Sequence, residues 1–254
     1  MLLAEELLLL ALDPEGGTPV NSSREPLRVS LCGALVAELG FAGLVEEQGR
    51  RLVPTVPPAD AMPPAAASLP ADAMPPADPM LPADRAPLAD HPLLAAYPLL
   101  ADVHRALGTG RGRRAADQLR RLDRAVGGVW GRVVDPLADA GVLGRRRDRV
   151  LVAHVTRHPV LRPAVRDEVV RRVRAAAASD DPLDPRTATL LALAGPSRLL
   201  EVVAPLRGER RHAKARIQDA TEQTPVAPIV RKVIHEAQAA SAAAVTAATV
   251  SASS

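Results

Sequence analysis

Proline is the residue that most limits how this chain can fold, because more than half of its prolines fall in one stretch. Of the 25 prolines in 254 residues, 13 lie between Pro54 and Pro98. The run PADAMPP occurs twice there, at residues 58–64 and again at 70–76. Proline lacks a backbone donor and breaks helices and central strands, so this stretch is unsuited to regular structure. We expect residues 57–90 to be an extended, mobile insert in a surface loop.

On both sides of this insert, the spacing of apolar residues predicts a mainly α-helical fold. Leu31, Leu35 and Leu39 share one face at helical spacing. The apolar run at residues 2–12 ends at a turn that contains a proline and two glycines. Further helices are expected at residues 26–39, 91–107, 115–126, 129–140, 160–178, 185–194, 196–205, 208–222 and 226–247.

Two small β-hairpins complete the predicted fold. In the first, strands at residues 43–45 and 51–56 flank a turn with the sequence EEQGR. In the second, GVL and VLVAHV flank GRRRDR, which we interpret as the turn. The predicted organisation is one helical domain built from residues 1–56 and 91–222. A C-terminal helix and an Ala/Ser-rich tail follow at 223–254.

The composition excludes several other classes of protein. Apolar residues make up 47 % of the chain, which is enough for a core. Phe41, Tyr97 and Trp130 are its three aromatic residues, too few for a typical β-sandwich or for a platform that stacks nucleic-acid bases. Cys32 is the one cysteine, which excludes an intrachain disulfide and a cysteine-rich metal site.

The N-terminus does not resemble a signal peptide, because Glu5 and Glu6 stand where such a peptide carries positive charge. The sequence also has no stretch of 18 uncharged, strongly apolar residues that could span a bilayer. We therefore expect a cytoplasmic protein that reaches membranes, if at all, from outside.

Charge is distributed unevenly along the chain. Residues 1–102 hold 5 basic and 14 acidic residues, a net charge of −9, whereas residues 103–174 hold 18 arginines and 7 acidic residues, a net charge of +11. A basic segment of this kind is typical of proteins that bind a phosphate-rich surface, either a membrane or a nucleic acid. The alternative is that these arginines pair with the acidic N-terminal third of the chain.

Candidate catalytic residues are few. Glu5 and Glu6, like Glu46 and Glu47, are adjacent in sequence, so their side chains do not converge on one substrate, and we interpret both pairs as solvated. Cys32 lies in an apolar helical run and is interpreted as a buried small residue. We predict no catalytic site and no cofactor, and therefore a non-enzymatic protein.

Two further motifs resemble ligand sites without the required context. His154 and His158 have helical metal-ligand spacing, but their run is strand-like and ends at a proline. The glycines and arginines of residues 108–114 suggest phosphate binding, but a helix precedes them where a phosphate loop needs a strand. We interpret this segment as a flexible helix–helix linker.

The sharpest local feature is the run of arginines at residues 145–149. It places four arginines beside the apolar residues Val150, Leu151 and Val152. Such a hairpin could contact anionic lipid headgroups with its basic residues while its apolar residues approach the membrane interface. The alternative is a solvated turn above a strand buried in its own core. The four basic residues in question are Arg145, Arg146, Arg147 and Arg149.

Five blocks of sequence, in order, resemble the Golgi phosphoprotein 3 family. They are AEELLLLALDPEGG, SLCGALVAELGFAGLV, LADAGVLGRRRDRVLV, TRHPVLRPAVRDEVVRRV and DPLDPRTATLLALAGPSRLLEVVAP. The resemblance covers residues 2–56 and 91–222. It implies a single mainly helical domain with small hairpins, and a peripheral membrane protein that binds phosphatidylinositol 4-phosphate and acts as an adaptor. It also implies that the hairpin at 145–157 mediates membrane contact and self-association.

The resemblance also implies where the lipid headgroup binds. The family's tryptophan and three arginines fall near Ser23, Cys32, Gly127 and Trp130, and none of these matches in type. Three nearby arginines are expected to substitute for them. These substitutes are Arg24, Arg28 and Arg132.

Two other functions remain open at this point. The helix and hairpin at residues 26–56 resemble a winged helix, which suggests a DNA-binding regulator, although the net charge of −9 over residues 1–102 disfavours nucleic acid. The third hypothesis is a scaffold that binds an unidentified protein partner and leaves its basic face to solvent.

Overall fold

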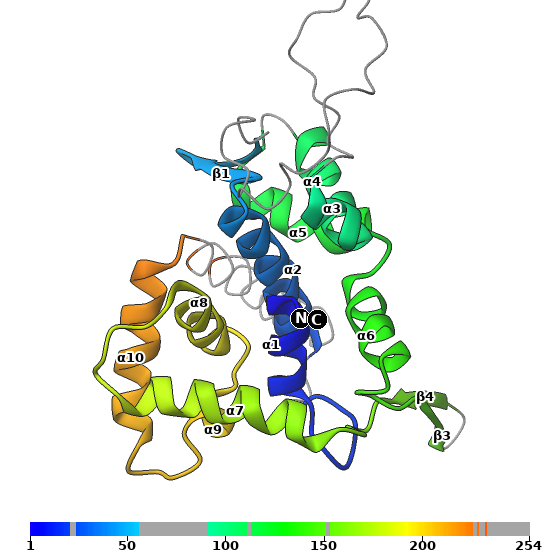
Figure 1. Cartoon of the computed structure of the whole chain (residues 1–254), viewed down its shortest axis with the longest axis vertical. Helices are drawn as coiled ribbons and strands as arrows, with labels where there is room; N and C mark the ends of the chain where they lie inside the picture. Colours follow the sequence, from blue (N-terminus) through cyan, green and yellow to red (C-terminus); the bar gives the residue numbers. More distant parts are fainter. Residues whose placement is uncertain are drawn as a thin grey trace, which may run out of the picture.

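The computed structural model describes residues 1–20, 24–55, 91–110, 113–150 and 153–225, together with residues 228 and 232. Within them it confirms a mainly helical fold with two small antiparallel hairpins and no large sheet (Figure 1). The helices are α1 (Leu3–Ala11), α2 (Arg24–Phe41), α3 (Pro92–Ala96), α4 (Pro98–Thr109), α5 (Ala115–Ala125), α6 (Val129–Asp139), α7 (Pro163–Ala178), α8 (Pro185–Ala194), α9 (Leu200–Val203) and α10 (Arg210–Gln223). The strands are β1 (Val45–Gln48), β2 (Arg51–Pro54), β3 (Arg146–Val150) and β4 (Ala153–Arg157).

Helix α1 lies at the centre of the molecule. Every residue from Leu3 to Ala11 is buried, and α1 packs against α2, α6, α7 and α8 (Figure 1). A helix that is apolar on all sides is stable only when it is surrounded in this way. The predicted apolar face of α2 is confirmed, since Leu31, Leu35 and Leu39 are fully buried.

Burial of α1 contradicts the interpretation of Glu5 and Glu6 as solvated residues. Their exposed fractions are 7 % and 5 %, because no side of α1 faces solvent. Glu6 pairs with Arg172 and lies 3.5 Å from Arg186, which also pairs with Glu38 at 2.8 Å. Buried carboxylates need such partners, since an unpaired buried charge is strongly destabilising. The interpretation holds for the second acidic pair, on β1, which is exposed.

The first hairpin is held against α5. Strands β1 and β2 pair from Val45 with Pro54 to Gln48 with Arg51, so the turn is shorter than EEQGR, and a positive φ of 65° at Gly49 suits it. The amide of Gln118 both accepts from the backbone N–H of Leu52 and donates to its carbonyl, each at 2.9 Å. This contact fixes α5 beside the hairpin.

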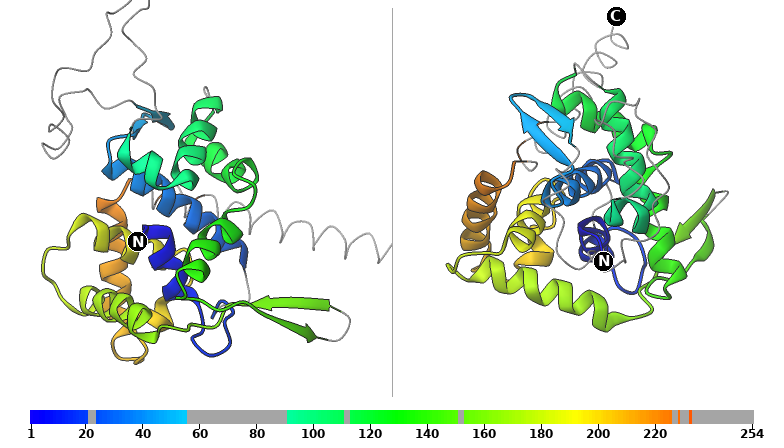
Figure 2. Two further views of the ribbon diagram at one scale, coloured as in Figure 1. Left: turned by 45° about the vertical axis from the view of Figure 1, so that its right-hand side comes forward. Right: turned by 45° about the horizontal axis from the view of Figure 1, so that its top comes forward.

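The second hairpin has its turn at a different place from the predicted one. Strands β3 and β4 pair from Arg146 with Arg157 to Val150 with Ala153. This register places the arginine run on strand β3, so GRRRDR is not the turn. The two residues between the strands, at 151–152, lie outside the described residues. Figure 2 shows this hairpin extending away from the helices.

Other helix boundaries differ for local reasons. The helix predicted at 91–107 is divided into α3 and α4 at Tyr97, because the residue before a proline disfavours helical geometry. The helix predicted at 196–205 is reduced to α9. The insert at 57–90 lies outside the described residues, as does nearly all of the predicted helix at 226–247. Their assignment stays a prediction.

Candidate anion-binding site

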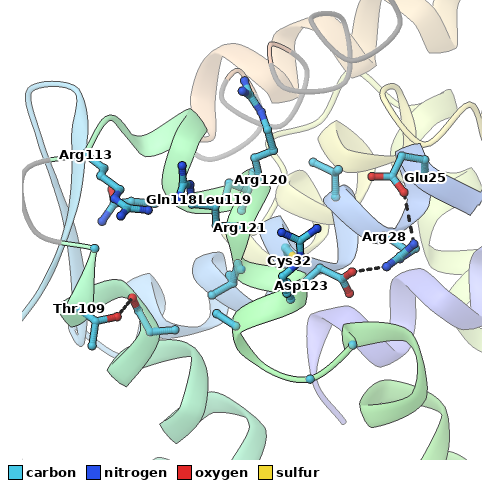
Figure 3. A pocket seen from close by; sticks show the side chains of 18 residues that line it. Glu25, Arg28, Cys32, Thr109, Arg113, Gln118, Leu119, Arg120, Arg121 and Asp123 are labelled. Carbon is cyan, nitrogen blue, oxygen red and sulfur yellow. Dashed lines mark hydrogen bonds and ion pairs between the residues drawn. The ribbon is translucent and has the colours of Figure 1, made fainter. Parts of the chain in front are cut away.

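A basic cleft of about 1100 Å³ lies between α2, the end of α4 and α5 (Figure 3). Five arginines and two acidic residues line it, which gives the lining a net charge of +3. These charged residues are Arg28, Arg113, Arg120, Arg121, Arg124, Glu25 and Asp123. A cleft with this surplus of guanidinium groups favours an anionic ligand, because field lines concentrate inside concave surfaces.

The sequence of α5 explains why its arginines line the cleft. Leu119 and Leu122 lie on the inner face of the helix and are 1 % and 2 % exposed. With these leucines inward, Arg120, Arg121 and Arg124 fall on the exposed side. These three residues are therefore exposed at the surface.

Ion pairs neutralise part of the cleft and leave part of it unmatched. Arg28 pairs with Asp123 and lies 3.4 Å from Glu25, while Arg120 lies 3.7 Å from Asp117. In the described part of the chain, no carboxylate pairs with three other arginines that line the cleft. These three are Arg113, Arg121 and Arg124, and we call them the unmatched arginines.

Cys32 lies at the base of the cleft, with 1 % of its surface exposed. Burial raises the pKa of its thiol to about 12, and the negative charge of Asp123 adds to this shift. The thiol therefore stays protonated at neutral pH and is a poor nucleophile. This confirms the interpretation of Cys32 as a buried small residue.

The structure separates the arginines predicted to substitute in the headgroup pocket. Arg28 lines the cleft. The side chain of Arg24, at the start of α2, lies outside the described residues, as does the whole of Ser23. Arg132 lies in a neighbouring hollow of about 330 Å³, where it pairs with Asp102 at 2.5 Å. Hydrogen bonding to Arg132 lowers the pKa of the Asp102 carboxyl, with a further contribution from Arg105.

Of the remaining family positions, Cys32 and Gly127 line the cleft, whereas Trp130 lies elsewhere. The ring of Trp130 packs near that of His158, with centroids 6.4 Å apart. Two of the four positions that the resemblance assigns to the headgroup pocket thus line the cleft, and the positive charge of the cleft comes from other residues.

Sequence reasoning missed the arginines of α5. The signal was present in the net charge of +11 over residues 103–174, but charge alone does not show which face each residue occupies. Arg113 belongs to the glycine-rich run that was interpreted as a linker, and it does follow helix α4 as expected. The structure adds that Gly110 and Arg113 of this linker line the cleft.

The arginines of the second hairpin are partly paired. Arg145 lies 2.8 Å from Asp135 and 3.4 Å from Asp139, which tethers the base of the hairpin to α6. Arg146 pairs with Asp148 at 3.0 Å. Arg147 is exposed and has no carboxylate partner within the described residues.

For the remaining predicted hairpin residues, the structure describes at most the backbone. The side chains of Arg149 and Val150 lie outside the described residues, as do Leu151 and Val152 entirely. The backbone register nevertheless puts Val150 last in β3, next to the connection. The sequence at the end of the hairpin is therefore Val-Leu-Val-Ala, with arginines before it.

The histidine pair lies in a strand and the loop after it, as expected. His158 is buried beyond the end of β4, with its Nδ1 atom 3.3 Å from the carbonyl oxygen of Gly144. The side chain of His154 lies outside the described residues. Across the described ranges, no group of three or more potential ligands among His, Cys, Asp and Glu could hold a metal ion.

These features define a class of protein: a mainly helical domain with a basic cleft and a projecting hairpin. The family model described as Golgi phosphoprotein 3 (GPP34) matches residues 3–237, nearly the whole chain. The chain therefore belongs to the Golgi phosphoprotein 3 family, which confirms the resemblance. None of the curated proteins matches the chain. Among the helices that the structure describes, none is long and apolar enough to cross a membrane.

Proposed function

We propose that this chain is a peripheral membrane protein that binds anionic phospholipid headgroups in the basic cleft. The observation that carries the proposal is the set of unmatched arginines on and beside α5, which face the cleft and have no carboxylate partner in the described chain. Guanidinium groups bind phosphate oxygens through charge-assisted hydrogen bonds, often two at a time.

The expected strength of this interaction is sufficient for reversible binding. Each basic residue close to an anionic surface contributes about 1 kcal/mol. The three unmatched arginines would therefore contribute about 3 kcal/mol, which salt would screen over about 8 Å at physiological ionic strength. Binding should fall steeply as salt is added.

The family relationship supports the same site. The resemblance assigns Cys32 and Gly127 to the family's headgroup pocket, and both line the cleft. Phosphatidylinositol 4-phosphate, the ligand implied by the family, carries a phosphomonoester as well as the phosphodiester that all phospholipids share. It belongs to the class of ligands that this cleft would accept, alongside other anionic phospholipids.

We further propose that the second hairpin makes a separate contact with the membrane and supports self-association. It extends from the body of the molecule, and its sequence ends in apolar residues preceded by arginines (Figure 2). Apolar residues flanked by basic ones suit the membrane interface. Replacing Val150, Leu151 and Val152 with serine should weaken vesicle binding without changing how steeply it depends on salt.

The proposal includes a non-enzymatic adaptor role, as the family implies. The DNA-binding alternative is disfavoured by the position of α2, which packs against α1, α4, α5, α6 and α8. A recognition helix must be free to enter the major groove, and α2 is enclosed. A scaffold that binds protein alone remains the competing hypothesis.

Co-sedimentation with vesicles tests the proposed function. The wild-type chain should bind vesicles of phosphatidylcholine that contain phosphatidylglycerol or phosphatidylinositol 4-phosphate, and should not bind phosphatidylcholine alone. Raising the salt concentration should release it. Binding that ignores salt, or no binding to either anionic vesicle, would contradict the proposal and favour the protein scaffold.

A further inference from the structure

Asp123 is an acidic residue inside a cleft whose charged lining is mostly arginine. Its side chain is 22 % exposed, and its carboxylate pairs with the guanidinium of Arg28 on the neighbouring helix (Figure 3). The same carboxylate accepts a hydrogen bond from the backbone N–H of Val129 at 2.7 Å, where α6 begins. One carboxylate therefore connects α2, α5 and α6.

The two oxygens of Asp123 have separate roles. Oδ1 accepts from the N–H of Val129, and Oδ2 faces Arg28. The contact with Val129 satisfies a helix-start donor, which a neutral amide oxygen could do as well. The contact with Arg28 depends on the negative charge. Changing that charge while keeping the shape should thus weaken the contact with Arg28 and leave the contact with Val129 in place.

We propose that Asp123 is a built-in competitor that holds Arg28 until a phosphate group replaces it. This inference rests on the proposed function of the cleft. When a phosphate enters, Arg28 exchanges the carboxylate for a phosphate oxygen, while Val129 keeps Asp123 in place. The ligand then meets a fixed negative charge beside it, so the cleft binds anions more weakly than its arginines alone would allow. Asp123 keeps binding reversible.

The test compares two substitutions that each remove one negative charge from an exposed helix face. Asp123→Asn keeps an oxygen for Val129 but removes the charge that pairs with Arg28. Asp219→Asn on α10 is the matched control, because Asp219 is 53 % exposed, lies 3.9 Å from Arg216, and neither of these two residues lines the cleft. The soluble probe is inositol 1,4-bisphosphate, whose binding to the full chain is followed by NMR titration and calorimetry.

Asp123→Asn should bind the probe about three- to fivefold more tightly than the wild type, the range expected for loss of one partly exposed charge interaction. Asp219→Asn should change the affinity by less than about 1.5-fold. A purely structural role for Asp123 predicts weaker binding. Equal gains in both variants, weaker binding by Asp123→Asn, or no binding of the probe by any variant would each overturn the proposal.

A second measurement on the wild type does not depend on how the variants fold. The carboxyl ¹³C resonance of Asp123 should move as the probe is added, because Arg28 leaves it, while that of Asp219 stays still. A stationary Asp123 resonance in a chain that binds the probe would overturn the proposal. A chain that binds the probe as predicted but ignores anionic vesicles would instead contradict membrane binding, and would leave the role of Asp123 intact.

Discussion

Arginines in two regions of this molecule have opposite surroundings. Beside α1, Arg172 and Arg186 meet the buried carboxylates of Glu6 and Glu38. Along α5, the unmatched arginines are exposed and meet no carboxylate of the described chain. The first group is part of the packing of four helices, whereas the second is free to take a ligand. The difference comes from the helices beside each group of arginines. Next to α7 and α8, helix α1 supplies the carboxylate of Glu6 and helix α2 supplies that of Glu38.

The comparison teaches that the net charge of a segment does not show which of its arginines have carboxylate partners. The interpretation that the basic segment pairs with the acidic N-terminal third is correct in part, because Arg172 pairs with Glu6 and Arg132 with Asp102, whereas the unmatched arginines have no carboxylate partner in the described chain. Removing one partner of a buried ion pair is strongly destabilising, because the other charge stays buried without a partner. An exposed arginine, in contrast, contributes little to stability. Substitutions in the two regions should therefore have different consequences.

The largest expected effect is loss of stability at the buried cluster. Arg186→Met leaves Glu38 without its ion-pair partner and Glu6 with one arginine fewer. Unfolding by urea should show a loss of about 3 kcal/mol, the lower end for breaking a buried ion pair. The control is Arg171→Met on α7, whose exposed pair with Glu168 should be dispensable. Similar losses in the two variants would remove the distinction between the regions.

A smaller effect of opposite sign is expected at Glu5, which has no arginine partner among the described residues. Burial raises the pKa of its carboxyl above the ordinary value of 4.5, although a hydrogen bond from the N–H of Leu2 opposes this shift. The charged form is thus disfavoured in the folded state at neutral pH. Glu5→Gln should leave stability at pH 7 unchanged or raise it by less than about 1 kcal/mol.

The pH dependence of the stability of Glu5→Gln tests whether the folded-state pKa of Glu5 is raised. A raised folded-state pKa means that the wild-type carboxyl contributes stability below its unfolded pKa and loses that contribution as pH rises through the folded pKa. Any advantage of Glu5→Gln should accordingly be greatest at pH 7 and shrink as pH falls toward 4.5. Urea unfolding across this pH range measures the difference in stability between the variant and the wild type. A stability gain of Glu5→Gln that grows on acidification would contradict a raised folded-state pKa for Glu5.

Much of the fold follows from sequence patterns. The face of α2 was predictable because its leucines recur at helical spacing, and the break before Pro98 follows the known restriction on the preceding residue. The burial of Glu5 and Glu6 was not, because it depends on the helices that surround α1 and, for Glu6, on Arg172, which lies 166 residues away in sequence. Local periodicity carries no information about such partners.

The candidate site was predictable only in outline. The resemblance assigns Cys32 and Gly127 to the headgroup pocket, and both line the cleft together with the predicted Arg28, but the other arginines that line it come from α5 and the preceding turn. The turn of the second hairpin was misplaced for a related reason, since strand register depends on cross-strand pairing, which a run of arginines does not reveal. Both the lining of the cleft and the position of the turn depend on contacts between segments, which the local sequence does not show.

The most direct test of the central claim compares two triple variants in vesicle binding. One replaces the unmatched arginines Arg113, Arg121 and Arg124 with serine. The matched control replaces Arg207, Arg211 and Lys214, which are exposed, lie on or just before α10 and line no part of the cleft. Both variants lose three positive charges, so a difference between them reports on position and not on net charge.

Dissociation constants for vesicles containing phosphatidylinositol 4-phosphate or phosphatidylglycerol give the answer. The cleft variant should bind roughly 100- to 200-fold more weakly than the wild type, as expected for the loss of about 1 kcal/mol from each of three arginines. The control should remain within about threefold of the wild type. Equal losses in the two variants, or full binding by the cleft variant, would contradict the assignment of this cleft as the lipid-binding site.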